Sequence, residues 1–245
     1  MKKSMANLLA LTEKKKTIGI IGGMGPLATA DLFRKIVLLT RADTDSEHIH
    51  IFVDNYPQIP DRTSAILEGS DRPLAYILES ARWLEKAGAD FLLIPCSTSH
   101  SYYEKIVAGT RLPVLNMLKA TASSLQREGV KEIGLLATDG TIKTNVFAKA
   151  FASCGIETIC PGPYDQKKVM DMIYQEIKAG RAIHLKPIFE VMDRLHARGA
   201  ERIVLGCTEL PIAFEGKFTE DMVDPTRILA IKAIQEAGYP CVAQK

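Results

Sequence analysis

Short apolar runs alternate with longer amphipathic segments along almost the whole chain. The apolar runs predict strands, and the amphipathic segments, whose apolar residues recur at helical spacing, predict helices. Predicted strands cover 17–21, 48–54, 91–95, 114–116, 132–137, 157–160, 202–206 and 222–224, and predicted helices cover 28–40, 74–87, 118–129, 144–154, 166–180 and 185–199. This alternation predicts an α/β fold with mostly parallel sheets flanked by helices.

Two pairs of segments repeat in the same order. Ile18 aligns with Ile133 and Cys96 aligns with Cys207, which are offsets of 115 and 111 residues. The repeat predicts two pseudo-symmetric lobes with the active site in the cleft between them, a common place for small-molecule sites. The predicted division is an N-terminal tail at 1–16, a first lobe at 17–112 plus 220–245, and a second lobe at 113–219.

The composition favours a protein of small-molecule chemistry. The 245 residues carry a net charge of +2, so no nucleic-acid or membrane partner is expected. No apolar run approaches the roughly 20 residues of a spanning helix. The short apolar run near the start is flanked by lysines and has no cleavage site, so it predicts a weakly helical tail rather than a signal peptide. Five widely spaced cysteines favour the reducing cytoplasm.

Cys96 and Cys207 each follow the apolar run of a repeated strand, and polar residues come directly after them. Active sites of open α/β sheets lie at the carboxyl ends of strands, so the pair predicts two thiols that face each other. A following helix N-terminus would lower the pKa of each thiol. A buried apolar role, a disulfide and a zinc site are the alternatives. The cysteines without this context are interpreted as structural: Cys154, Cys160 and Cys241.

Two loops after predicted strands indicate ligand contacts. The first, 22–26, is glycine-rich and opens a helix, so it permits close approach of backbone to a small anion. It also formally matches a dinucleotide fingerprint, which leaves a nucleotide enzyme as an alternative. Its repeat copy, 137–141, offers the hydroxyl groups of Thr138 and Thr141 instead, which can hold a carboxylate.

Three other residues have competing interpretations. Arg62 ends a proline-rich loop, where it either binds a carboxylate or pairs with Asp61. Lys178 lies at a predicted helix C-terminus, where cations are favoured in any case. His100 follows Cys96 by four residues, and a Cys–His nucleophile is the less favoured interpretation because the ring is expected to point away from the thiol.

Four motifs together resemble the aspartate/glutamate racemase family, in its aspartate racemase branch, whose members work without pyridoxal phosphate. The motifs are IIGGMGP at 20–26, IPDRT at 59–63, PCSTSH at 95–100 and LGCTELP at 205–211. The resemblance spans nearly the whole chain outside the tail. It implies two pseudo-symmetric α/β lobes with the site between them and a homodimer.

The same resemblance implies roles for individual residues. Cys96 and Cys207 would be the two catalytic acid–base thiols, and no cofactor or metal is expected. The residues that would surround the substrate are Met24, Arg62, Ser97, Thr98, Thr138, Thr141, Lys178, Thr208 and Glu209. Ser97 stands where the family usually has asparagine, and serine lacks the amide group of that residue.

The expected activity is racemisation of aspartate, with glutamate as a second substrate, by proton transfer between two thiols at Cα. The ligand is therefore expected to be an acidic amino acid. Alternatives within the superfamily are a broader amino-acid racemase, a hydantoin racemase, a maleate isomerase and a decarboxylase. A non-catalytic binding protein for acidic amino acids is the alternative from another class.

Overall fold

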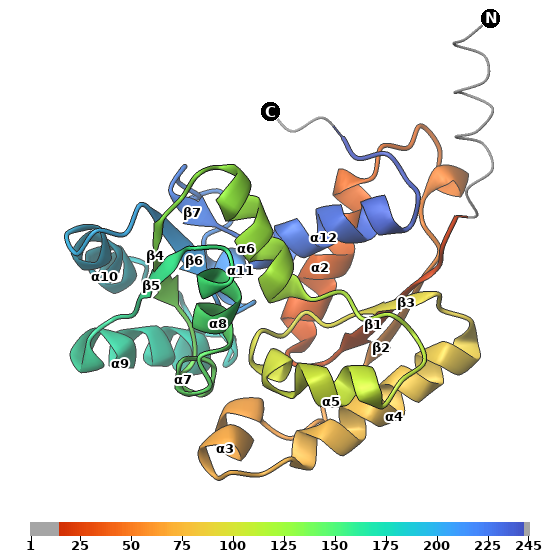
Figure 1. Cartoon of the computed structure of the whole chain (residues 1–245), viewed down its shortest axis with the longest axis horizontal. Helices are drawn as coiled ribbons and strands as arrows, with labels where there is room; N and C mark the ends of the chain where they lie inside the picture. Colours follow the sequence, from red (N-terminus) through yellow and green to blue (C-terminus); the bar gives the residue numbers. More distant parts are fainter. Residues whose placement is uncertain (1–14, 243–245) are drawn as a thin grey trace, which may run out of the picture.

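The structure is a computed structural model that describes residues 15–242. It confirms the predicted α/β fold, with two parallel sheets flanked by helices (Figure 1). The first sheet has the order β2-β1-β3, and the second has the order β5-β4-β6-β7. The strands are β1 (Ile18–Gly22), β2 (Ile51–Asn55), β3 (Phe91–Leu93), β4 (Glu132–Leu136), β5 (Glu157–Ile159), β6 (Arg202–Leu205) and β7 (Met222–Val223).

Helices cover the faces of both sheets (Figure 1). The α-helices are α2 (Pro26–Leu39), α3 (Arg62–Leu67), α4 (Arg72–Ala87), α5 (Tyr103–Ala108), α6 (Met117–Arg127), α7 (Asp139–Lys143), α8 (Val146–Ala152), α9 (Pro163–Asp171), α10 (Lys186–His196), α11 (Leu210–Ala213) and α12 (Pro225–Glu236). Two 3₁₀ segments, η1 (Asp45–Glu47) and η2 (Thr98–Tyr102), and a π-helical segment, η3 (Met172–Ile177), complete the described elements.

The two halves of the chain repeat in structure as well as in sequence. Each half has a central strand with one neighbour on either side, and β1, β2 and β3 correspond to β4, β5 and β6. The bridge between Leu92 and Val114 takes the place in the first sheet that β7 takes in the second. A helix with a side-chain N-cap follows both the Val114 bridge and β7. Asn116 accepts from the Lys119 amide at the start of α6, and Asp224 accepts from the Thr226 amide at the start of α12.

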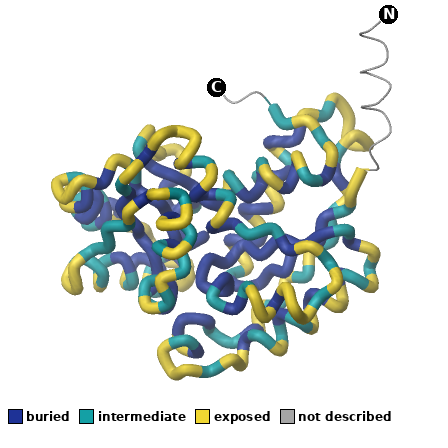
Figure 2. Tube along the Cα trace, viewed as in Figure 1, coloured by how far each residue is buried: buried dark blue, intermediate teal, exposed yellow. Residues whose placement is uncertain are grey.

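These two capped helices cross between the lobes. α6 packs on α8 of the second half, and α12 packs on α2 of the first half, while α6 and α12 also contact each other (Figure 1). A helix from each half therefore packs on the other half of the chain. One apolar cluster extends through both halves, and its members include Ile20, Leu32, Phe147 and Leu229. Figure 2 shows this buried interior under exposed outer helices.

The crossing bears on the predicted lobe boundaries. Helix α12 lies against the first lobe, as the assignment of 220–245 to that lobe predicts. Strand β7 of the same segment instead pairs with β6 in the second sheet, with Ile203 opposite Met222. The boundaries at 112 and 219 stay a prediction. Of the predicted tail, 1–14 lies outside the described residues.

Several element predictions differ from the structure. The predicted helix 166–180 is an α-helix followed by the π-helical segment η3, and the predicted helix 144–154 is shorter and follows the separate helix α7. The predicted strand 114–116 contributes one bridge only. Among residues 15–242, no helix is long and apolar enough to cross a membrane.

Candidate active site

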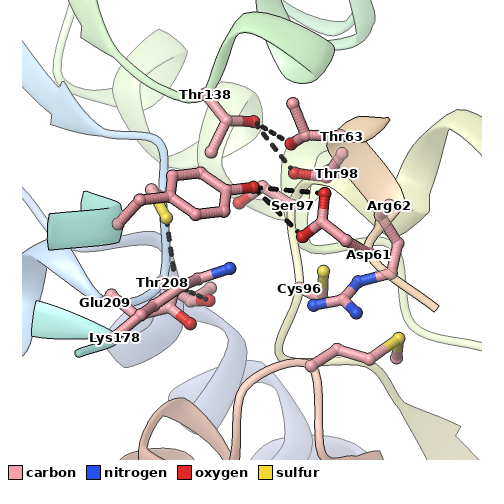
Figure 3. Close-up of a pocket in the computed structure, with 13 residues that line it drawn as sticks. Asp61, Arg62, Thr63, Cys96, Ser97, Thr98, Thr138, Lys178, Thr208 and Glu209 are labelled. Atoms are coloured by element: carbon pink, nitrogen blue, oxygen red, sulfur yellow. Dashed lines mark hydrogen bonds between the residues drawn. The ribbon is translucent and has the colours of Figure 1, made fainter. Parts of the chain in front are cut away.

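One small pocket between the two lobes contains both repeated cysteines (Figure 3). Cys96 lies beyond the end of β3 and Cys207 beyond the end of β6, so the equivalent strands of the two halves supply one thiol each. The pocket has a cavity volume of about 10 Å³, so its own side chains nearly fill it. Its lining residues are Met24, Asp61, Arg62, Thr63, Cys96, Ser97, Thr98, Thr138, Tyr174, Lys178, Cys207, Thr208 and Glu209.

The glycine-rich turn shapes one wall of this pocket. Gly23 has a φ of 86°, and a Cβ there would lie 2.3 Å from the Tyr56 backbone. A Cβ on Gly25 would lie 3.0 Å from Glu209 Oε1. Thr29 Oγ1 accepts from the Gly23 amide and donates to the Gly25 carbonyl, at 2.9 Å each. Because the turn borders a carboxylate, it is a poor place for the phosphates of a nucleotide.

Arg62 lies beside the first thiol. Its Nη1 donates to the carbonyls of Ile59 and Pro60 at 3.1 Å each, which fixes the guanidinium in the pocket. Burial lowers the pKa of Arg62, but the neighbouring Cys96 and Asp61 outweigh burial and raise it. Arg62 is only 7% exposed and Cys96 only 4%, so this cation and thiol interact away from solvent.

The sequence suggests Asp61 only as a partner for Arg62, but its carboxylate has other hydrogen-bond partners in the structure. Its Oδ1 accepts from the Ser64 amide at 2.8 Å and caps α3, and its Oδ2 accepts from the Tyr174 hydroxyl at 3.1 Å. Burial raises the pKa of Asp61, but the Ser64 amide and the Lys178 and Arg62 charges lower it overall. Burial raises the pKa of Tyr174 to about 12, so its hydroxyl stays protonated. The hydrogen bond from this hydroxyl to Asp61 joins the second lobe to the first.

The second thiol is held by a carboxylate. Cys207 Sγ donates to Glu209 Oε2 at 3.0 Å, and Thr208 Oγ1 lies 3.3 Å from the same oxygen. Burial and the Glu209 charge raise the pKa of Cys207 well above its ordinary value, and Lys178 only partly opposes them. The expectation of a lowered pKa is therefore wrong for Cys207. The backbone amide of Glu209, at the N-cap of α11, does lower the pKa, but burial and the Glu209 carboxylate outweigh that amide.

Lys178 reaches the pocket from the end of the π-helical segment η3. Its ammonium lies 4.5 Å from the centre of the Tyr174 ring. Burial lowers the pKa of Lys178, but Glu209 and Cys207 raise it above its ordinary value. In Figure 3, Lys178 and Arg62 approach the same space from opposite sides. Each thiol therefore has one cation nearby.

Hydroxyl groups from both lobes form a cluster beside the thiols. Thr98 Oγ1 lies 3.2 Å from Thr138 Oγ1 and 2.9 Å from Thr141 Oγ1. Thr63 Oγ1 donates to Thr138 Oγ1 at 3.2 Å. Gly140 permits this contact, since a Cβ there would lie 2.9 Å from Thr63 Cα. The cluster can reorient its hydroxyl protons toward an anion in the pocket.

His100 bonds the backbone of Cys96, not its sulfur. Nδ1 donates to the Cys96 carbonyl at 3.0 Å, and Nε2 accepts from the Met117 amide at 3.2 Å, an arrangement that requires the neutral ring. Burial lowers the pKa of His100 to about 4. The ring thus points away from the thiol, as expected, and does not form a Cys–His pair.

The structure brings together every predicted site residue except Thr141, which lies directly behind Thr98 and Thr138. Asp61, Thr63 and Tyr174 line the pocket but were not predicted. Asp61 and Thr63 flank Arg62 in the loop motif, so the motif itself was the available signal. Tyr174 lies one helical turn before Lys178, a spacing that could have indicated a shared face.

Two thiols from repeated halves line one pocket, an arrangement that suits proton transfer at a carbon centre. Comparison with known sequences agrees, since the chain matches the Asp/Glu/Hydantoin racemase family over residues 21–233. The chain belongs to this family.

Individual relatives indicate which kind of racemase this chain is most similar to. The aspartate racemase of Picrophilus torridus is 31% identical, with a TM-score of 0.83 over 93% of this chain and 96% of that chain. The broad specificity amino-acid racemase RacX of Bacillus subtilis is 27% identical over 79% of this chain and 85% of its own. A glutamate racemase from Persephonella marina is 26% identical over 57% of this chain and 53% of its own. These likenesses support amino-acid racemase activity.

Proposed function

We propose that the protein interconverts L- and D-aspartate without a cofactor, by proton transfer between Cys96 and Cys207. The observation that carries this proposal is the pair of buried thiols, which come from equivalent strand ends and line one pocket with a cation near each. Racemisation needs one group to remove the α-proton and another to return a proton to the opposite face.

The surroundings of the two thiols suggest which one starts as the acid. Cys207 donates a hydrogen bond to Glu209 and has a raised pKa, so it enters the reaction as a thiol. Cys96 lies beside the Arg62 guanidinium, and we assign it the role of the base. Cys96 Sγ then takes the α-proton while Cys207 Sγ–H delivers its own proton to the other face of Cα. The pair ends with the proton on Cys96, ready for the reverse direction.

The remaining polar groups stabilise the charge that develops during this step. Negative charge moves from the thiolate to Cα and into the α-carboxylate as the proton leaves. Arg62 and the hydroxyl cluster are fixed before the reaction, and preorganised donors of this kind lower the barrier most in a site that excludes water.

Aspartate is favoured because two cations, Arg62 and Lys178, border the pocket, and a dicarboxylic substrate needs two. The likeness to the broad specificity racemase from Bacillus subtilis supports a second candidate, a racemase that also accepts other amino acids. Ser97 supports the same candidate, since it is smaller than the asparagine usual there.

The test is incubation of L-aspartate, L-glutamate and neutral amino acids in D₂O without pyridoxal phosphate, followed by chiral analysis and proton NMR. Loss of the α-proton signal together with inversion is expected for aspartate. Binding without exchange would refute the enzyme proposal and leave an acidic amino-acid binding protein.

Replacing either thiol, by Cys96→Ser or Cys207→Ser, is expected to lower racemisation at least about 1000-fold, because the serine hydroxyl is a far weaker acid than a thiol and is not ionised to a base at neutral pH. Each variant is expected to keep some exchange for one enantiomer only. Cys154→Ser, outside the pocket, is the matched control. Normal racemisation by either pocket variant would rule out the two-thiol mechanism.

We further propose that the protein is a cytoplasmic homodimer. Trp83 on α4 is 67% exposed and Val53 on the edge strand β2 is 42% exposed, so large apolar side chains are available for contact with a second copy. Sedimentation of the wild type against Trp83→Glu tests the dimer, which is expected to weaken when this surface becomes charged.

A further inference from the structure

Buried polar atoms without a partner gather in the pocket. Among residues 15–242, seven buried side-chain polar atoms have no hydrogen-bond partner, and three of them belong to pocket residues: Arg62 Nε, Ser97 Oγ and Glu209 Oε1. Proteins rarely leave buried polar groups unpaired, since each costs free energy. Three in one pocket indicate groups that pair with a ligand.

The chemistry of the three atoms specifies the ligand. Arg62 Nε only donates and carries positive charge, so it takes an anionic oxygen. Glu209 Oε1 only accepts when ionised, so it takes a donor and favours a cationic one. Ser97 Oγ can do either. A molecule that satisfies all three atoms carries an anion and an ammonium group close together.

Glu209 is the carboxylate available for that ammonium. The other carboxylate that lines the pocket, Asp61, already accepts from Ser64 on one oxygen and from Tyr174 on the other. Glu209 is held by Cys207 and Thr208 through Oε2 alone, which fixes the direction of its free oxygen. That oxygen lies against Gly25, where the missing side chain leaves room for it.

We propose that Glu209 Oε1 binds the α-ammonium of the substrate and thereby selects free α-amino acids. The assignment rests on the proposed function and specifies its substrate class. A single carboxylate then holds the acid thiol on one oxygen and the substrate nitrogen on the other, which brings Cα to Cys207. Hydantoins, whose ring nitrogens are uncharged, and maleate, which has no amine, lack the group that Glu209 pairs with.

The experiment measures binding, not turnover, by titration calorimetry with L-aspartate and with succinate, which is aspartate without its ammonium. The wild type is expected to bind aspartate at least about 10-fold more tightly than succinate. Glu209→Gln keeps the shape of the side chain and removes its charge. It is expected to weaken aspartate binding by about 10-fold to 100-fold, the range for a hydrogen bond to a charged group, and to leave succinate binding unchanged or tighter.

The succinate measurement also reports whether the variant pocket is intact. Glu215→Gln is the matched control, because Glu215 is exposed on the surface and pairs with Arg34. Equal loss of both ligands in Glu209→Gln would assign Glu209 a structural role and overturn the proposal, as would unchanged aspartate binding. Exchange in D₂O tests the racemase separately, so selective binding without exchange would keep the ammonium site and reject the enzyme.

Discussion

His100 makes the stability of the protein sensitive to acid. The ring is buried and neutral, donates to the carbonyl of Cys96 and accepts from the amide of Met117 at the start of α6. In the folded protein its pKa is about 4, against an ordinary value of 6.5. As the pH falls below 6.5, the unfolded chain takes up a proton that the folded protein refuses, so acid favours unfolding.

The magnitude follows from the size of this shift. One pKa unit corresponds to about 1.4 kcal/mol, so the shift of His100 removes about 3 kcal/mol of unfolding free energy between pH 6.5 and pH 4. The loss is large beside the 5–15 kcal/mol, roughly, that stabilises a typical protein.

Urea unfolding of the wild type and His100→Gln, at several pH values from 7.5 to about 4, measures this contribution. At neutral pH the variant is expected to be less stable by about 1–2 kcal/mol, because glutamine cannot make both hydrogen bonds well. The difference is expected to vanish or reverse near pH 4, where only the wild type has lost the contribution of His100. His184→Gln is the control, since His184 is exposed. A difference that stays constant with pH would refute the reasoning.

Two further substitutions test other contacts. Gly25→Ala places a methyl group 3.0 Å from Glu209 Oε1 and is expected to lower kcat/KM at least about 10-fold by displacing that carboxylate; Gly162→Ala, with open space around its Cβ, is the control, and equal activity of both variants would contradict the role of Gly25. Lys35→Met removes the ammonium that lies 2.5 Å from Asp31 and 2.6 Å from Asp224. Arg34 and the α12 backbone amides then remain as partners of these two carboxylates. A loss of about 3 kcal/mol is expected in chemical denaturation, and an unchanged midpoint would show that the network contributes nothing.

The repeat made much of the fold predictable. Hydrophobic periodicity located the strands, and the matched offsets of Ile18 and Cys96 with their counterparts indicated two equivalent halves before any contact was known. The predicted boundaries assign 113–219 to the second lobe and 220–245 to the first, but the contacts that α6 and α12 make come from the structure alone. An amphipathic face shows that a helix packs, not which sheet it covers, so the symmetric crossing of α6 needed the structure.

The candidate site was predictable where the residues occur in motifs. Both cysteines follow strands, and Arg62 ends a recognisable loop. Tyr174 was missed because its partner, Asp61, lies in the other lobe, 113 positions away along the chain. The π-helical segment that places Tyr174 and Lys178 has the same amphipathic pattern as an α-helix. Contacts of this kind depend on how the lobes meet, which no local pattern reports.

The scaffold is nearly symmetric, but the chemistry at its two thiols is not. Thr98 and Glu209 occupy equivalent positions, two residues after their cysteines. Thr98 bonds to the hydroxyl cluster, whereas Glu209 accepts a hydrogen bond from the Cys207 thiol. One position of the repeat therefore places a carboxylate on the Cys207 thiol and a neutral hydroxyl residue after Cys96. A racemase must accept both enantiomers, so each of the two thiols must be able to start the reaction as the base. The Glu209 carboxylate, which accepts a hydrogen bond from Cys207 Sγ, is the group placed to balance these two protonation states.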